Sequence, residues 1–144
     1  QLLQRTQEQL DAKKAGIEFY KGKAITAEQQ IETLKAARDL KIAQLENKLR
    51  QTRIKVQSDS VEAIAAANEF KIATVQYQRQ RALFDSGLVS MVQLEQRNQA
   101  FQNAQAKKIS AENKLANSRQ DLILLRIEQN SAQQEYIEKM QKAE

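Results

Sequence analysis

Residues 79–95 read RQRALFDSGLVSMVQLE, and they decide the fold because they hold the strongest helix-ending signal in the sequence. Gly87 suits the position just past a helix end, where a residue with positive φ stops the helix. In that register Leu83 and Leu88 take the two positions whose side chains make the apolar contact of a Schellman motif. The stretch therefore predicts that a helix ends immediately before Gly87.

A second helix is predicted to begin within a few residues of this end. Ser90 and Gln93 match a capping box, in which the serine and the glutamine each bond the other's backbone. Val89 and Leu94 lie at the positions of a hydrophobic staple. A connection this short makes the two helices antiparallel neighbours, so we expect a hairpin with its turn near residues 86–89.

Seam residues on both sides of the turn repeat every seven positions, as in a coiled coil. Before the turn the repeat comprises Leu3, Leu10, Ile17, Ala24 and Ile31, then Ile42, Leu49, Val56, Ala63, Phe70, Tyr77 and Phe84. After the turn it comprises Leu94, Phe101, Lys108, Leu115, Leu122, Gln129 and Tyr136, with the mostly small companions Ala104, Ala111, Ser118, Leu125 and Ala132. The eleven-residue step from Ile31 to Ile42 predicts a stutter near residues 32–41, which unwinds a coiled coil without ending it.

The predicted fold class is all-α: a long antiparallel two-helix coiled-coil hairpin that forms one unit over residues 1–144. Its first arm covers residues 1–86 and its second arm covers residues 90–144. Because the first arm is longer, residues 1–32 have no partner within the hairpin.

Three explanations remain open for this unpartnered segment. The chain opens on Gln rather than Met, so we expect a fragment whose parent protein continues helically past Glu144 and covers the segment; we favour this explanation. A break near residues 16–22, at Gly16 and Gly22, would instead let the start of the chain fold back. The third explanation is that another copy of the chain covers it.

Composition argues against catalysis. The sequence has no His and no Cys, so the commonest catalytic base and the usual zinc ligands are missing, and we expect neither enzyme activity nor a cofactor. The net charge of +5 is concentrated in residues 35–55, which hold seven basic and two acidic residues. A basic patch of this kind binds nucleic acid in some proteins, but no aromatic residues interleave with the charges as stacking platforms. We therefore favour a solvated surface and expect no nucleic-acid partner.

The tip is the candidate binding site, because ends and loops carry function on rigid scaffolds. At 100° per residue, Arg79 and Leu83 lie about 40° apart and point away from the seam. Ile72 and Gln76 continue the same stripe, which earlier in the chain passes through Val61, Ala65 and Asn68. We expect this stripe to face neighbouring copies or a partner's helices.

The spacing of Arg79, Leu83 and Ser90 resembles the Arg-Leu-Ser tip motif of periplasmic adaptor proteins, also called membrane fusion proteins of the HlyD type. The surrounding RALFDSGLVSMVQLEQ looks like the hairpin turn of that family. The specific part of the likeness covers about 17 residues, while the hairpin character covers the whole chain.

This resemblance implies a part in type I secretion or efflux in a Gram-negative bacterium. Family members are anchored in the inner membrane, project into the periplasm and carry lipoyl and β-barrel domains, which are absent here. Their hairpins assemble in rings, typically as homo-hexamers, between an inner-membrane transporter, such as an ABC exporter, and a TolC-like outer-membrane channel. By this resemblance Arg79, Leu83 and Ser90 would contact the channel. Two rival expectations are an inert coiled-coil spacer and a nucleic-acid-binding coiled-coil arm.

Overall fold

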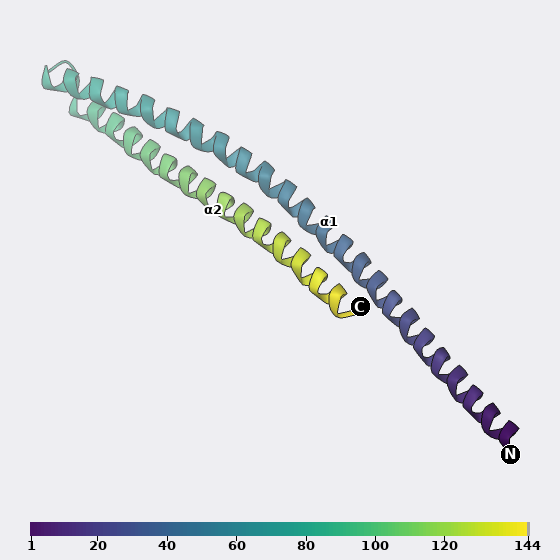
Figure 1. Ribbon diagram of the computed structural model, residues 1–144. Coiled ribbons are helices and arrows are strands. Elements are labelled where there is room, and N and C mark those ends of the chain that lie inside the picture. The colour runs from purple at the N-terminus through teal and green to yellow at the C-terminus, as the bar shows by residue number, and fades with distance from the viewer. Residues whose placement is uncertain (144) are drawn as a thin grey trace. The chain divides into compact units, whose positions relative to one another are not determined.

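The computed structural model describes residues 1–143 and contains two α-helices, α1 (Leu2–Asp85) and α2 (Met91–Ala143), joined by residues 86–90 (Figure 1). The predicted all-α helical hairpin is therefore confirmed. Each helix contributes to two compact units. Unit 1 combines Gln1–Glu46 with the described residues from Ile127 onward, and unit 2 is Asn47–Arg126, which includes the turn.

In unit 2 the two helices pack through small side chains. Ala63, Ala66 and Ala111 are buried and form a cluster against which Leu115 packs. Small residues let two helix backbones approach closely, as the heptad pattern predicts. The other predicted seam residues of unit 2 are also buried or half-buried: Leu49, Val56, Phe70, Tyr77, Phe84, Leu94, Phe101, Ala104, Lys108, Ser118, Leu122 and Leu125.

An aromatic cluster holds the helices together between the small-residue core and the turn. The Phe101 ring of α2 lies 5.3 Å from the Phe70 ring and 5.4 Å from the Tyr77 ring of α1, measured between centroids. The Lys108 ammonium group lies over the Phe70 ring, 5.1 Å from its centroid. Aromatic pairs and cation–π contacts of this geometry stabilise the packing beyond the area they bury.

Three polar pairs join the helices along one side of unit 2, which we call the polar flank. Gln76 accepts a hydrogen bond of 3.0 Å from Arg97, Glu69 pairs with Lys107 at 3.3 Å, and Glu62 pairs with Lys114 at 3.0 Å. The three α1 members are spaced by seven residues, each directly before a seam residue. They therefore lie at the edge of the helix–helix contact, where polar side chains can pair while they remain accessible to water.

Unit 1 contains the segment for which the sequence predicts a stutter. Leu45 is fully buried, and Lys41 of α1 pairs with Glu128 of α2 at 3.8 Å. Half-buried or buried positions include Ile31, Leu34, Arg38, Ile42 and Leu45, at intervals of three, four, four and three residues. The extra interval of four is the spacing that a stutter produces.

The start of α1 is one continuous helix. It runs without interruption through Gly16 and Gly22, so the break considered near residues 16–22 does not occur, and the chain does not fold back there. An isolated glycine weakens a helix by only about 1 kcal/mol, which neighbouring turns can offset. Gly16 is half-buried, and every other residue from 1 to 26 is exposed, including the heptad members Leu3, Leu10 and Ile17.

Candidate partner-binding site at the hairpin tip

The end of α1 has the hydrogen bonds of a Schellman motif. The Leu88 backbone N–H donates to the Leu83 carbonyl at 2.9 Å, and the Gly87 N–H donates to the Phe84 carbonyl at 2.9 Å. Gly87 has a φ of 73°, a value that costs an L-residue with a side chain about 1–2 kcal/mol. The carbonyls at the helix end are thus satisfied within the chain, and the direction of the turn is fixed.

The start of α2 has the predicted capping box. The Gln93 backbone N–H donates to the Ser90 hydroxyl oxygen at 3.2 Å, and the Ser90 N–H donates to the Gln93 side-chain oxygen at 3.1 Å. Val89 and Leu94, the proposed staple residues, are both half-buried. Two capping motifs with only Val89 between them make the connection a defined structure rather than a loose loop.

The three motif residues differ in how much of each is available to a partner. Arg79 is exposed, and among residues 1–143 its guanidinium makes no hydrogen bond or ion pair. Leu83 is half-buried. Ser90 is exposed, but its hydroxyl oxygen already accepts the capping hydrogen bond. Leu83 and Ser90 therefore each have a structural role within the turn, whereas the Arg79 side chain has no such role.

Two residues of the predicted outward stripe, Ile72 and Gln76, differ in their exposure to solvent. Ile72 is 58% exposed, as an outward residue should be. Gln76 is half-buried, and its amide oxygen accepts the hydrogen bond from Arg97 of α2. Gln76 directly precedes the seam residue Tyr77, so it belongs to the polar flank and not to the outer face. Ile72 is thus exposed to a neighbouring molecule, whereas the Gln76 amide oxygen already accepts a hydrogen bond within the hairpin.

Three exposed apolar residues at the tip were not predicted from the sequence to contact a binding partner. Leu88 is 72% exposed, Met91 is 52% exposed and Val92 is 62% exposed. The Schellman geometry leaves Leu88 largely in solvent instead of covering it with Leu83. The heptad register could have predicted the exposure of Met91 and Val92, because both residues precede Leu94, the first seam residue of α2, and lie outside the seam. These three residues add exposed apolar area at the turn and at the first turn of α2.

The basic segment of residues 35–55 contains two ion-paired side chains in unit 1. Arg38 pairs with Asp39 at 3.2 Å, and Lys41 pairs with Glu128 at 3.8 Å. Both pairs reduce the positive charge that a phosphate backbone would meet.

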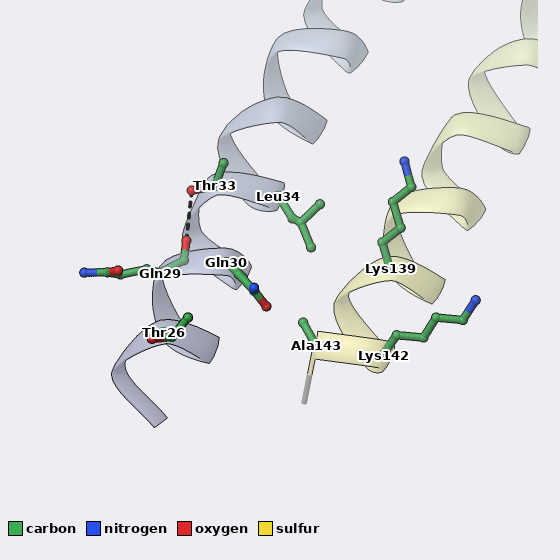
Figure 2. A pocket seen from close by; sticks show the side chains of 8 residues that line it. All are labelled: Thr26, Gln29, Gln30, Thr33, Leu34, Lys139, Lys142 and Ala143. Carbon is green, nitrogen blue, oxygen red and sulfur yellow. Dashed lines mark hydrogen bonds between the residues drawn. The ribbon is translucent and has the colours of Figure 1, made fainter. Parts of the chain in front are cut away.

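An open groove lies in unit 1 where the described part of α2 ends (Figure 2). It encloses about 580 Å³ and is lined by Thr26, Gln29, Gln30, Thr33, Leu34, Lys139, Lys142 and Ala143. Figure 2 shows Leu34 pointing toward α2, and the Thr33 hydroxyl donating to the Gln29 carbonyl at 2.9 Å. The groove is shallow and offers only two cationic side chains, so it has little means to select a small ligand.

Within residues 1–143 no cluster of three or more His, Cys, Asp or Glu side chains is placed to hold a metal ion. Neither α1 nor α2, over the residues that the structure describes, has a stretch that is apolar enough to span a bilayer. Comparisons with protein-family models, with curated proteins and with solved structures find no match to this chain.

Proposed function

We propose that this chain is the helical hairpin of a periplasmic adaptor that docks by its tip to an outer-membrane channel of the TolC type. In this role it bridges the channel to an inner-membrane transporter, an ABC exporter or a transporter of another class, in type I secretion or efflux. The proposal places the hairpin in the periplasm as part of a protein anchored in the inner membrane, with several copies, six by the family resemblance, acting together.

The observation that carries the proposal is the exposed, unpaired Arg79 beside a tightly capped turn. Both capping motifs are internally satisfied, so the tip needs no partner to keep its shape. A preorganised tip loses little conformational freedom on binding, which favours affinity. The Arg79 guanidinium offers several N–H donors to carbonyl or carboxylate groups of a channel, and the apolar residues Leu88, Met91 and Val92 offer contact area.

A single tip contact would be weak because its area is small. Copies held side by side repeat the contact, and multivalency makes the combined attachment firm yet reversible. This requirement connects docking at the tip with association along the helices.

The decisive experiment is export of a cargo by cells that depend on this protein, with Arg79→Asp and Leu83→Ser as test variants. The matched control is Arg53→Asp, because Arg53 is also exposed but lies more than seven helical turns from Arg79 along α1. Lost export with Arg79→Asp, retained export with Arg53→Asp and equal helical melting of both would support docking. Normal export with both tip variants would overturn the proposal.

An inert spacer is the second candidate function, and a specific observation favours it. Leu83 and Ser90 both have local structural roles, in the Schellman motif and in the capping box respectively. If these roles are the whole reason for the motif, substitutions that preserve the turn leave export unchanged. The Arg79→Asp result separates the two candidates, because Arg79 has no local role to lose.

A further inference from the structure

A pocket of about 250 Å³ lies in unit 2, close to the turn of the hairpin. It is lined by Gln80 of α1 and by Gln93, Gln96, Arg97 and Ala100 of α2. Small-molecule sites are usually larger, about 300–1,000 Å³, and mostly apolar. The size and the polar lining of this pocket therefore suit a single polar side chain of another protein better than a cofactor.

Two polar side chains of the pocket are held in place by bonds inside the hairpin. The amide oxygen of Gln93 accepts the capping bond from the Ser90 N–H at 3.1 Å, which leaves the amide nitrogen of Gln93 to donate to another group. Arg97 donates one hydrogen bond of 3.0 Å to Gln76 and keeps further N–H donors. Both donor groups are thus positioned before a partner arrives, so less conformational entropy is lost on binding.

Gln80 adds a third donor to the pocket. Its amide oxygen is buried and has no hydrogen-bond partner among residues 1–143, so the amide nitrogen is the polar atom that Gln80 can offer to a bound group. Gln80 follows Ala66 and Ala73 at intervals of seven residues, and both alanines are at least half-buried in the seam. The seam therefore lacks a small apolar companion at this level, and the pocket lies there.

The pocket contains a positive charge that no carboxylate of the hairpin balances. Arg97 forms no ion pair within residues 1–143, and its hydrogen bond goes to the neutral amide of Gln76. A fixed guanidinium group binds a carboxylate through two parallel N–H bonds, and the amide nitrogens of Gln80 and Gln93 add further donors. This set of donors is complementary to an anion and has no charge to attract a cation.

The pocket lies on the side of the tip that carries Arg79 and Leu83. Leu83 follows Gln76 by seven residues, so it continues the line of the polar flank toward the turn. Arg79 lies three residues after Gln76 and four before Leu83, which makes it a neighbour of both on the helix surface. Because Gln76 bonds Arg97, a partner that contacts Arg79 and Leu83 comes within reach of the pocket.

We propose that this pocket receives the carboxylate of an aspartate or glutamate side chain of the outer-membrane channel, held by Arg97, Gln80 and Gln93. The inference rests on the proposed docking function and deepens it, because it assigns the channel a chemical group that docking requires. Arg79 differs from the pocket in this respect, since its exposed guanidinium bonds carbonyl groups as well as carboxylates. The pocket requires an anion at one position and thereby selects among channels.

Titration of the purified chain with sodium acetate tests the pocket directly. Acetamide serves as the neutral analogue, and sodium chloride at matched ionic strength serves as the salt control. In NMR spectra of the isotopically labelled chain, acetate should shift the side-chain N–H signals of Arg97, Gln80 and Gln93 saturably, and severalfold more than acetamide or chloride does. Shifts no larger than those of the two controls would overturn the inference.

Two variants close the pocket in different ways. Gln80→Glu places a carboxylate beside Arg97 and occupies the site from within, and Arg97→Met removes the cation. Both should abolish the acetate shifts. The matched control is Gln78→Glu, because Gln78 is exposed and lies about 200° around α1 from Gln80, so the same charge change falls outside the pocket. It should bind acetate like the wild type.

The export assay then connects the pocket with docking. Gln80→Glu and Arg97→Met should lower export severalfold with little change in helical melting temperature, whereas Gln78→Glu should export normally. Normal export with Gln80→Glu and Arg97→Met, while Arg79→Asp abolishes export, would overturn the pocket inference and leave docking through Arg79 intact. Normal export with Arg79→Asp as well would overturn the docking proposal, and with it the channel as the source of the carboxylate, whatever the result with acetate.

Discussion

The Asp59 carboxylate of α1 lies 3.8 Å from the Lys114 ammonium group of α2, and Asp59 is only 3% exposed. The second carboxylate oxygen of Asp59 is buried without a hydrogen-bond partner among the described residues 1–143. Lys114 is closer to Glu62, at 3.0 Å, and is itself largely solvated. The buried Asp59 thus occupies a seam position, and it shares Lys114 with Glu62, which lies closer to the ammonium group.

Replacing Asp59 with Leu should raise the free energy of unfolding by about 1 kcal/mol or more. The change removes an incompletely paired buried charge, and Lys114 keeps Glu62 as a partner. Thermal unfolding followed by circular dichroism measures the effect. Glu62→Gln is the control and should change stability by less than about 1 kcal/mol, because it alters an exposed pair. A lower melting temperature for Asp59→Leu would show that the buried carboxylate stabilises the hairpin.

The stability contributed by Lys114 should disappear at high pH. The hydrogen bond that Lys114 donates to Glu62, followed by the negative charges of Glu62 and Asp59, raises the pKa of Lys114 above its ordinary value of 10.5. A raised pKa in the folded state means that the contribution is fully present below 10.5 and is lost as the pH rises through the folded pKa. The difference in melting temperature between the wild type and Lys114→Met should therefore be constant from about pH 7 to about pH 9 and shrink above pH 10.5. A difference that is unchanged at the highest pH would argue against this ionic contribution.

Gly87→Ala should destabilise the hairpin by about 1–2 kcal/mol, because alanine resists the φ of 73° at this position. The same substitution at Gly22 should stabilise α1 by up to about 1 kcal/mol, since Gly22 lies inside an exposed helix with open space around the added carbon. Chemical denaturation of both variants measures the opposite signs. Equal effects at the two sites would contradict the assigned turn geometry.

Ser90→Ala should lower stability by about 1 kcal/mol through loss of the cap on α2, whereas Ser90→Asn should retain most of it. The pair also separates capping from docking. If export falls with Ser90→Ala and is normal with Ser90→Asn, the serine acts through the turn. If export falls with both variants although Ser90→Asn melts like the wild type, the hydroxyl group itself contacts the partner.

The turn and the seam could be predicted from the sequence because both depend on local rules. Gly87 and Ser90 are recognisable from backbone chemistry within a few residues, and heptad spacing identifies which residues lie between the helices. Gln76 could not be placed in this way. It lies one residue before Tyr77, about 100° around the helix from that seam residue, and at this edge position only the neighbouring Arg97 of α2 decides that the side chain turns toward the partner helix.

The matching of heights between α1 and α2 could not be predicted for a different reason. Local rules place Ile72 on an outer stripe of α1 that also includes Val61, Ala65 and Asn68. Which residues of α2 lie at the same height follows only from the cross-hairpin pairs. That information requires the antiparallel register, which depends on side chains more than 50 residues apart, as in Glu62 and Lys114.

The order of the polar pairs along the hairpin also bears on how the chain folds. Gln76 and Arg97 are 21 residues apart, and Glu62 and Lys114 are 52 apart. The entropy lost in closing a loop grows with its length, so the pair nearest the capped turn closes most easily and shortens the loop for the next. Assembly is then expected to start at Gly87 and proceed like a zipper. Substitutions at the turn should slow folding, while those far from it should mainly speed unfolding.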